Sequence, residues 1–302
     1  MKFQGVLFFP VTPFTADGSL DEERLARHIE SGVTAGAGGV FVACGTGEFH
    51  ALTPDEIERA TRVAVAATAG RVPVLAAAGG PVPVARDQAA RIARAGADGI
   101  LLLPPYLVTA PQQGLVRYVE EIAAASDLPV VFYQRGTARL TPATAATIAA
   151  LPQVVGLKDG IGDIEGMHRI VRAVRALPEG RDFLFFNGLP TAEMTAPAYR
   201  GIGVGLYSSA VFAFAPEIAL AFHGALARGE DTLVSTLLDE FYGPLVRLRD
   251  EVPGYAVALV KAGVTLRGLD VGGVRAPLVD PAPEHVARLA KLIDHGLEAV
   301  HA

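Results

Sequence analysis

A lysine at the end of an apolar segment is the residue of this chain best placed for chemistry. Lys158 follows the strand-like run Val154–Leu157 and precedes Asp159-Gly160, and only three other lysines occur, against 22 arginines. Arginine keeps its proton in a protein, whereas a lysine removed from water can lose it and attack a carbonyl carbon to form a Schiff base. The position therefore suggests a Schiff-base nucleophile. The structural alternative is a strand-end lysine whose stem is buried while its amine reaches water.

Polar residues and glycines also follow other strand-like runs of the chain. In a parallel barrel the active site lies at the carboxyl ends of the strands, so these residues would converge on Lys158. Gly45 and Thr46 could offer backbone N–H groups and a hydroxyl to an anion, and Arg135 could pair with a carboxylate. Each also has a structural interpretation, as a tight turn, barrel packing or a surface cation. The candidates to line the site are Gly45, Thr46, Tyr106, Tyr133, Arg135, Asn187, Ser208 and Ser209.

Three other kinds of catalytic site find less support in the residue pattern. The seven histidines are scattered, mostly on expected helices and without metal-ligand spacing, which disfavours metal catalysis. Ser208 and Ser209 lack the Gly-x-Ser-x-Gly sequence of a hydrolase nucleophile and an evident base. A phosphate site at Gly203-Val204-Gly205 is disfavoured because its glycines are too loosely spaced.

The elements that would position these residues alternate regularly along the chain. Apolar, β-rich runs alternate with Ala/Arg/Glu-rich amphipathic segments, and a Thr cap followed by Pro recurs at helix starts, as in Thr53-Pro54 and Thr141-Pro142. Eight such strand–helix units predict a parallel (β/α)8 barrel, the TIM barrel, of the α/β class. A doubly wound open sheet is the main alternative, but no Gly-x-Gly-x-x-Gly sequence follows the first strand. The expected strands are 5–9, 39–43, 72–76, 99–103, 129–133, 154–158, 183–187 and 204–208, and the expected helices 21–35, 54–69, 83–95, 112–126, 142–150, 164–177, 190–199 and 213–228.

The pattern changes after residue 228, beyond which only helices are expected. They lie near 230–249, 254–267 and 283–300, with a Gly/Pro-rich joint at 268–283. We therefore divide the chain into a barrel, residues 1–228, and a three-helix C-terminal appendix, residues 229–302, packed on the barrel.

Composition limits what the protein can bind and where it can act. With 302 residues, 51% of them apolar and 19% charged, the chain can bury a large core, and it has no apolar stretch of about 20 residues to span a bilayer. A net charge of −6 without a basic block disfavours binding to nucleic acid. The start of the chain lacks signal-peptide features and the single cysteine, Cys44, excludes an internal disulfide, so we expect a cytoplasmic protein.

Taken together, these segments resemble the Schiff-base lyase superfamily of dihydrodipicolinate synthase and N-acetylneuraminate lyase. The matching motifs are Gly45-Thr46-Gly47-Glu48 after the second strand, Tyr133 at the end of the fifth and Gly156-Leu157-Lys158-Asp159 at the end of the sixth. The resemblance implies that Lys158 is the Schiff-base residue, that Tyr133 is a proton relay, and that Gly45 and Thr46 form the cradle for the α-carboxylate of a keto acid. It also implies a homotetramer built from dimers.

Further segments are similar to one branch of this superfamily, the decarboxylating dehydratases of sugar diacids. The implied substrate is a six-carbon keto-deoxy diacid, which would lose water and CO2 through a Schiff base on Lys158, without a metal or other cofactor. Asn187, Ser208 and Ser209 would hold its distal hydroxyl and carboxylate. A retro-aldol lyase acting on 2-keto-3-deoxy sugar acids and a catalytically inactive barrel that binds a sugar acid are the alternatives. The similar segments are Gly45–His50, Tyr133-Gln134-Arg135, Lys158–Asp163, Phe186–Glu193 and Tyr207–Ala210.

The sequence departs from these patterns at several places, and one of them is Tyr133-Gln134-Arg135-Gly136 where the synthase has Tyr-Asn-x-Pro. Cys44-Gly45-Thr46-Gly47-Glu48 stands where the synthase has Gly-Thr-Thr-Gly-Glu, so the first Thr of its proton relay is absent. Leu107 follows Tyr106 where that enzyme has a second Tyr. Gly136-Thr137-Ala138 replaces the Asp-Asn-Ala usual in the dehydratases, which leaves the substrate contacts after the fifth strand open.

Overall fold

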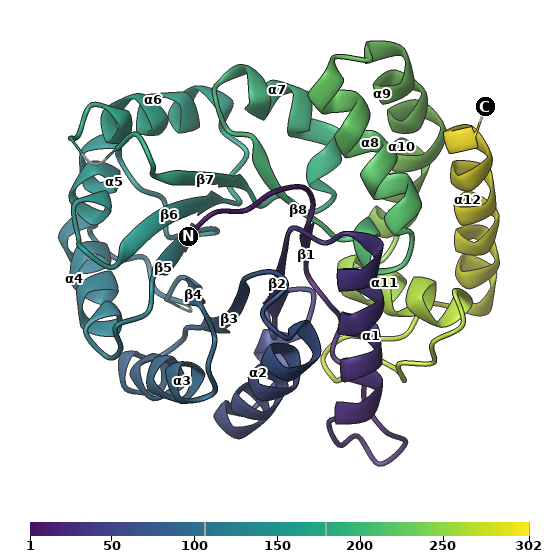
Figure 1. The fold of residues 1–302 in the computed structure, drawn as a ribbon, viewed down its shortest axis with the longest axis horizontal. Coiled ribbons are helices and arrows are strands. Elements are labelled where there is room, and N and C mark those ends of the chain that lie inside the picture. Colours follow the sequence, from purple (N-terminus) through teal and green to yellow (C-terminus); the bar gives the residue numbers. More distant parts are fainter. Residues whose placement is uncertain (106, 179, 302) are drawn as a thin grey trace.

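Eight parallel strands form a closed barrel in the computed structural model, which describes residues 1–105, 107–178 and 180–301. The strands are hydrogen-bonded in sequence order, and β8 pairs with β1 to close the sheet (Figure 1). This confirms the predicted (β/α)8 fold. Tyr106, one of the predicted binding residues, lies outside the described residues. The strands are β1 (Leu7–Phe8), β2 (Gly39–Val42), β3 (Val74–Ala78), β4 (Gly99–Leu102), β5 (Val130–Gln134), β6 (Val154–Asp159), β7 (Leu184–Asn187) and β8 (Leu206–Ser209).

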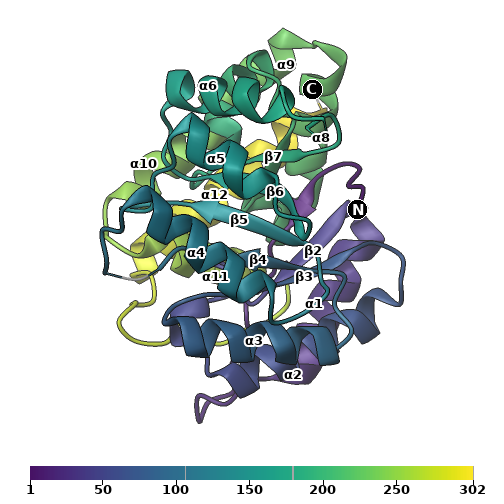
Figure 2. The ribbon, with the colours of Figure 1, turned by 90° about the vertical axis from the view of Figure 1, so that its left-hand side faces the viewer.

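Helices follow the strands and cover the outside of the barrel, as Figure 2 shows from the side of α4 and α5. Both predicted Thr caps are present. The Thr53 hydroxyl accepts from the Glu56 backbone N–H, and the Thr141 hydroxyl accepts from that of Thr144. The helices of the barrel are α1 (Glu22–Ala35), η1 (Phe49–Ala51), α2 (Pro54–Thr68), α3 (Val82–Arg94), α4 (Gln112–Ala123), α5 (Pro142–Ala149), α6 (Ile164–Arg175), η2 (Ala192–Thr195), α7 (Ala196–Gly201), η3 (Val211–Ala213) and α8 (Pro216–Arg228).

The C-terminal appendix is helical and lies along one side of the barrel. Figure 1 shows α12 at the outer edge of the molecule, where it contacts α8, α9, α10 and α11. No helix in the described ranges is both long and apolar enough to cross a membrane. The division of the chain at residue 228 into a barrel and an appendix packed on it stays a prediction. The helices of the appendix are α9 (Asp231–Leu237), η4 (Leu238–Tyr242), α10 (Gly243–Asp250), α11 (Tyr255–Leu266) and α12 (Pro283–His301).

Two of the predicted helices are interrupted and a third begins late, and a proline lies at each of these places. The expected helix 190–199 is divided into η2 and α7, with Pro197 in the first turn of α7. The expected helix 213–228 is preceded by η3 and begins only at Pro216. In the appendix, a π-helical turn, η4, separates α9 from α10, which carries Pro244 in its first turn. Because proline donates no N–H group, it favours a helix start or an irregular turn over a continuous helix.

The inside of the barrel is filled by large apolar side chains that form the floor of the site. Phe9 and Phe41 stack with their ring centroids 4.6 Å apart, and Phe186 meets Phe41 edge-on. These rings are almost fully buried and pack with other apolar side chains inside the sheet. The fold thereby places any cavity of the barrel at the end where the candidate residues were predicted.

Candidate active site

A cavity of about 390 Å³ opens at the carboxyl ends of the barrel strands. Its wall combines residues from the barrel with residues from the appendix, including Arg249 on α10 and Tyr255 on α11. The residues predicted from the sequence that line it are Gly45, Thr46, Tyr133, Arg135, Lys158 and Ser208.

Lys158 lies at the base of this cavity with its amine against two aromatic faces. Its side chain is buried, and Nζ lies 4.2 Å from the ring centroid of Tyr133 and 4.6 Å from that of Phe9. None of the carboxylates that the structure describes forms an ion pair with it. Burial lowers the pKa of Lys158 to about 8, and the positive charge of Arg135 adds to this change. Near neutral pH more of this amine is therefore unprotonated than in an exposed lysine, and the free amine can attack a carbonyl carbon.

Tyr133 stands next to Lys158 because β5 and β6 place these two residues in register. Its hydroxyl donates to the Gly188 carbonyl oxygen at 2.8 Å, and Arg135 Nη1 lies 3.5 Å from that hydroxyl. Burial raises the pKa of Tyr133, with Arg135 acting in the opposite direction. Tyr133 is consequently protonated at neutral pH and available as a proton donor.

Two glycines allow the lysine and the tyrosine to approach the neighbouring backbone. A Cβ at Gly188 would lie 2.7 Å from Lys158 Cε and 2.9 Å from a Tyr133 ring carbon. A Cβ at Gly160 would lie 2.7 Å from the Tyr133 hydroxyl oxygen. Any larger residue at either position would have to displace one of the two reactive side chains.

The loop after β2 presents Gly45 and Thr46 to the cavity. Gly45 is exposed there, and nothing lies within 4 Å of the position a Cβ would take. The loop is closed by hydrogen bonds from the Phe49 N–H to the Cys44 carbonyl and from the Thr12 hydroxyl to the Gly47 carbonyl. The open side of Gly45 and the Thr46 hydroxyl form a candidate anion cradle, a name we keep for these two residues.

Cys44 lies inside the barrel, directly before the two residues of the loop that face the cavity. Its thiol is fully buried and donates to the Val42 carbonyl oxygen at 3.4 Å. Burial raises the pKa of this thiol to about 12, so it is neutral when Lys158 reacts. Cys44 does not line the cavity, whereas Tyr133, in register with Lys158 across the sheet, does.

Asn187 and Ser209 do not line the cavity, which corrects the expectation that they face it. The Asn187 amide donates to the Ala192 carbonyl at 3.0 Å and to the Thr195 hydroxyl at 2.8 Å. The Ser209 hydroxyl donates to the buried carboxyl of Glu193 at 2.5 Å. Successive residues of a strand point to opposite faces, so Ser208 can face the cavity only if Ser209 faces away from it. Both misplaced residues secure the turns that follow their strands.

Asp159 is the residue of the lysine motif whose role the sequence left undefined. It is fully buried, accepts from the Gln134 amide at 2.8 Å and from the Ile161 N–H at 3.1 Å, and also accepts from the Tyr199 hydroxyl. Its carboxylate therefore fastens the ends of β5 and β6 together and is turned away from Lys158.

Arg249 is a cavity residue that the sequence analysis did not find. It lies on α10, and its Nη1 donates to the Pro190 carbonyl at 3.1 Å and to the Thr191 hydroxyl at 2.8 Å. No local motif surrounds it, and it lies 91 positions after Lys158. Only the packing of the appendix brings this second cation to the cavity wall.

No metal site accompanies these groups in the part of the chain that the structure describes. Nowhere in those ranges do three or more His, Cys, Asp or Glu side chains gather in a way that could hold a metal ion.

Comparison with known proteins gives a consistent set of relatives. The family model described as the dihydrodipicolinate synthetase family matches residues 2–296. The chain is 58% identical to a probable 5-dehydro-4-deoxyglucarate dehydratase 1 of Streptomyces coelicolor, covering 97% of this chain and 92% of that protein. It is 46% identical to a probable 5-dehydro-4-deoxyglucarate dehydratase of Azotobacter vinelandii, covering 96% and 94%.

Solved structures of similar fold belong to the same family. Dihydrodipicolinate synthase from Bacillus clausii superposes with a TM-score of 0.87 at 25% identity, over 96% of each chain. A prophage protein of the dihydrodipicolinic acid synthase family from E. coli K12, in complex with pyruvate, superposes with a TM-score of 0.84 at 26% identity, over 97% of this chain and 98% of that one.

The two adjacent serines are expected to respond oppositely to removal of the hydroxyl. Ser209→Ala leaves the buried Glu193 carboxyl without its donor and should lower the free energy of unfolding by about 1–3 kcal/mol. It should leave the trapping of a keto acid on Lys158 unchanged. Ser208→Ala should weaken that trapping and leave stability within about 0.5 kcal/mol. Urea unfolding measures the free energy of unfolding, and borohydride trapping with a sugar keto acid measures adduct formation on Lys158. Equal effects of the two variants would contradict the conclusion that Ser208 faces the cavity and Ser209 faces away from it.

Schiff-base formation on Lys158 is expected to rise with pH through about 8, because the attacking form is the free amine. Arg135→Met removes a positive charge that lowers the pKa of Lys158, so the midpoint should move to higher pH. The measurement is the initial rate of borohydride-trapped adduct against pH, with the neutral ketone hydroxyacetone, so that carboxylate binding plays no part. Arg139→Met, at an exposed arginine of the same loop, is the matched control. A midpoint that Arg135→Met leaves in place would contradict the electrostatic coupling.

Proposed function

Because the chain belongs to the dihydrodipicolinate synthetase family, we propose that it is a Schiff-base hydro-lyase that converts 5-dehydro-4-deoxyglucarate to 2,5-dioxopentanoate, CO2 and water. The observation that carries the proposal is the buried amine of Lys158, which lies against the ring of Tyr133 at the base of a cavity with two arginines on its wall. The names of the dehydratase relatives support the choice of substrate.

The reaction begins with attack of Lys158 Nζ on the ketone carbon, which loses water to give an iminium. The positive nitrogen acidifies the adjacent methylene, and loss of a proton there gives an enamine. The enamine expels the β-hydroxyl as water, which leaves an iminium conjugated with a carbon–carbon double bond. This system takes up the electron pair released when the far carboxylate leaves as CO2. Protonation and hydrolysis then free the product and regenerate the amine.

The proposed roles of the other residues follow their places in the cavity. The anion cradle holds the carboxylate next to the ketone, and Tyr133 protonates the hydroxyl that leaves as water. Arg135 and Ser208 hold the distal end of the diacid, and Arg249 is a second cation available to it. Asn187 and Ser209 have no part in binding, because their polar groups are engaged in the turns. The mechanism uses the lysine as its electron sink and requires no metal or organic cofactor.

We further propose that the enzyme is a cytoplasmic homotetramer, which the family resemblance supports. The lone buried Cys44 is compatible with a reducing compartment. The proposed partners are limited to the small sugar diacid and to other copies of the chain.

The bond that breaks distinguishes this proposal from a retro-aldol lyase. Incubation with 5-dehydro-4-deoxyglucarate should release CO2 in a 1:1 ratio to substrate and yield a five-carbon keto-aldehyde. Mass spectrometry of the products and trapped CO2 measure this outcome. A panel of 2-keto-3-deoxy acids serves as the control set, and pyruvate as the main product from the diacid would reassign the protein to the aldolases.

Tyr133→Phe is expected to slow turnover by roughly 10²–10⁴-fold, the usual effect of removing a positioned proton donor. The adduct on Lys158 should still form, because the ring that contacts the amine remains. Steady-state kinetics and borohydride trapping in parallel separate the two effects. Turnover at the wild-type rate would show that the proton travels by another route.

A further inference from the structure

The buried carboxylate of Glu48 joins the anion cradle to the appendix. Glu48 follows the cradle in the loop between β2 and α2 and is fully buried. Its Oε1 accepts from Lys261 Nζ on α11 at 3.0 Å, and its Oε2 accepts from the backbone N–H of Arg275 at 2.8 Å. Both oxygens of this barrel carboxylate are therefore bonded to the appendix, more than 200 positions away in the sequence.

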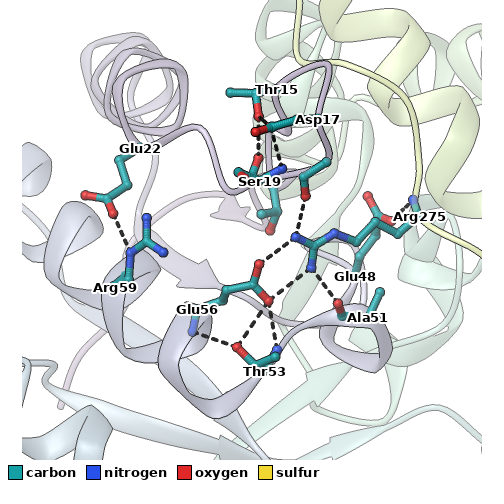
Figure 3. Close-up of polar contacts among 12 residues, drawn as sticks. Thr15, Asp17, Ser19, Glu22, Glu48, Ala51, Thr53, Glu56, Arg59 and Arg275 are labelled. Atoms are coloured by element: carbon teal, nitrogen blue, oxygen red, sulfur yellow. Dashed lines mark hydrogen bonds and ion pairs between the residues drawn. The ribbon is translucent and has the colours of Figure 1, made fainter.

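Arg275 also holds the far end of the same loop. Its guanidinium donates to both carboxylate oxygens of Glu56 and to the Ala51 carbonyl at 2.7 Å, as Figure 3 shows. Glu56 in turn caps the first turn of α2 through the backbone N–H of Thr53 at 2.9 Å. Lys261 Nζ and the Arg275 guanidinium lie 4.3 Å and 4.0 Å from the ring centroid of Phe14, which fixes both cations.

The loop between β2 and α2 needs such support because its backbone is strained on both sides of the cradle. Ala43 has a φ of 52° and Glu48 a φ of 57°, the left-handed region that residues other than glycine rarely adopt. Such a conformation persists only where the surrounding structure holds it. Gly45 and Thr46 lie between these two residues, so the direction of their N–H and hydroxyl groups depends on how Glu48 is held.

We propose that Glu48, Lys261 and Arg275 are positioning residues that hold the anion cradle in the conformation that binds the α-carboxylate of the substrate. The proposal rests on the proposed function, since it takes Gly45 and Thr46 as ligands of that carboxylate. It assigns the appendix a part in a reaction whose bond-making groups all come from the barrel.

The test compares two small ketones that differ in a single group, which is charged in one and neutral in the other. Pyruvate carries the carboxylate that the cradle would bind, and pyruvamide replaces it with a neutral amide of similar shape. The concentration dependence of borohydride trapping on Lys158 gives an apparent dissociation constant for each. The ratio of the two constants measures recognition of the carboxylate separately from the reactivity of the lysine.

Lys261→Met is expected to lower the preference for pyruvate by about ten- to a hundredfold, the usual effect of losing a charge-assisted contact. Trapping of pyruvamide should stay within about threefold of wild type, since Lys158 is untouched. Glu48→Gln keeps the shape of the side chain and should give a smaller loss in the same direction. The two changes combined should lower the preference no further than Lys261→Met alone, because they break one contact. Lys291→Met, at an exposed lysine of α12, is the matched control.

The milder Glu48→Gln variant keeps the test decisive if Lys261→Met does not fold. A wild-type preference for pyruvate in either folded variant, or an equal loss for both ketones, would overturn the proposal. Pyruvate lacks the leaving hydroxyl and the distal carboxylate, so the result does not depend on which bond the enzyme breaks. Failure of the dehydratase assignment would appear instead in the CO2 measurement.

Discussion

An amine held against aromatic faces, without a counter-ion among the described residues, is the constraint on which the rest of this site depends. Lys158 Nζ faces the rings of Tyr133 and Phe9, and burial among them lowers its pKa. A carboxylate beside it would restore the proton and remove its reactivity. The adjacent Asp159 could be such a group, but strand alternation turns it to the other face, where Gln134 and Tyr199 take up its oxygens.

The close approach of the reactive side chains determines which residues can surround them. Lys158 and Tyr133 face each other across β5 and β6, and β7 delivers Gly188 directly beside both. The missing side chain at position 188 leaves the space that the lysine occupies, and the carbonyl of the same residue orients the Tyr133 hydroxyl. Gly188 thus provides both the space for Lys158 and a hydrogen-bond acceptor for Tyr133. A residue with a side chain at position 188 would provide the acceptor but would occupy the space of the lysine.

The sequence predicts the features of this protein that depend on local pattern. The eight strands, the barrel and the positions of Lys158 and Tyr133 at strand ends follow from apolar runs and their spacing. The sequence predicted that both Ser208 and Ser209 bind substrate, but only Ser208 lines the cavity. Two adjacent serines at a strand end look alike in the sequence, although their side chains point to opposite faces. Arg249 and Lys261 could not be predicted, since they sit on helices whose docking on the barrel depends on packing between distant parts of the chain. The interrupted helices around Pro197, Pro216 and Pro244 show the same limit on a smaller scale.

The two loops of the site that bear strain share one kind of support. Glu48 after β2 and Thr191 after β7 both adopt left-handed backbone, with φ of 57° and 51°. Each is bonded to a cation from the appendix, Glu48 to Lys261 and Thr191 to Arg249. A left-handed residue other than glycine costs about 1–3 kcal/mol, and a charge-assisted hydrogen bond contributes a similar amount. The contacts from the appendix can therefore offset the backbone strain of both loops. They hold the loops after β2 and β7 in the positions that shape the cavity.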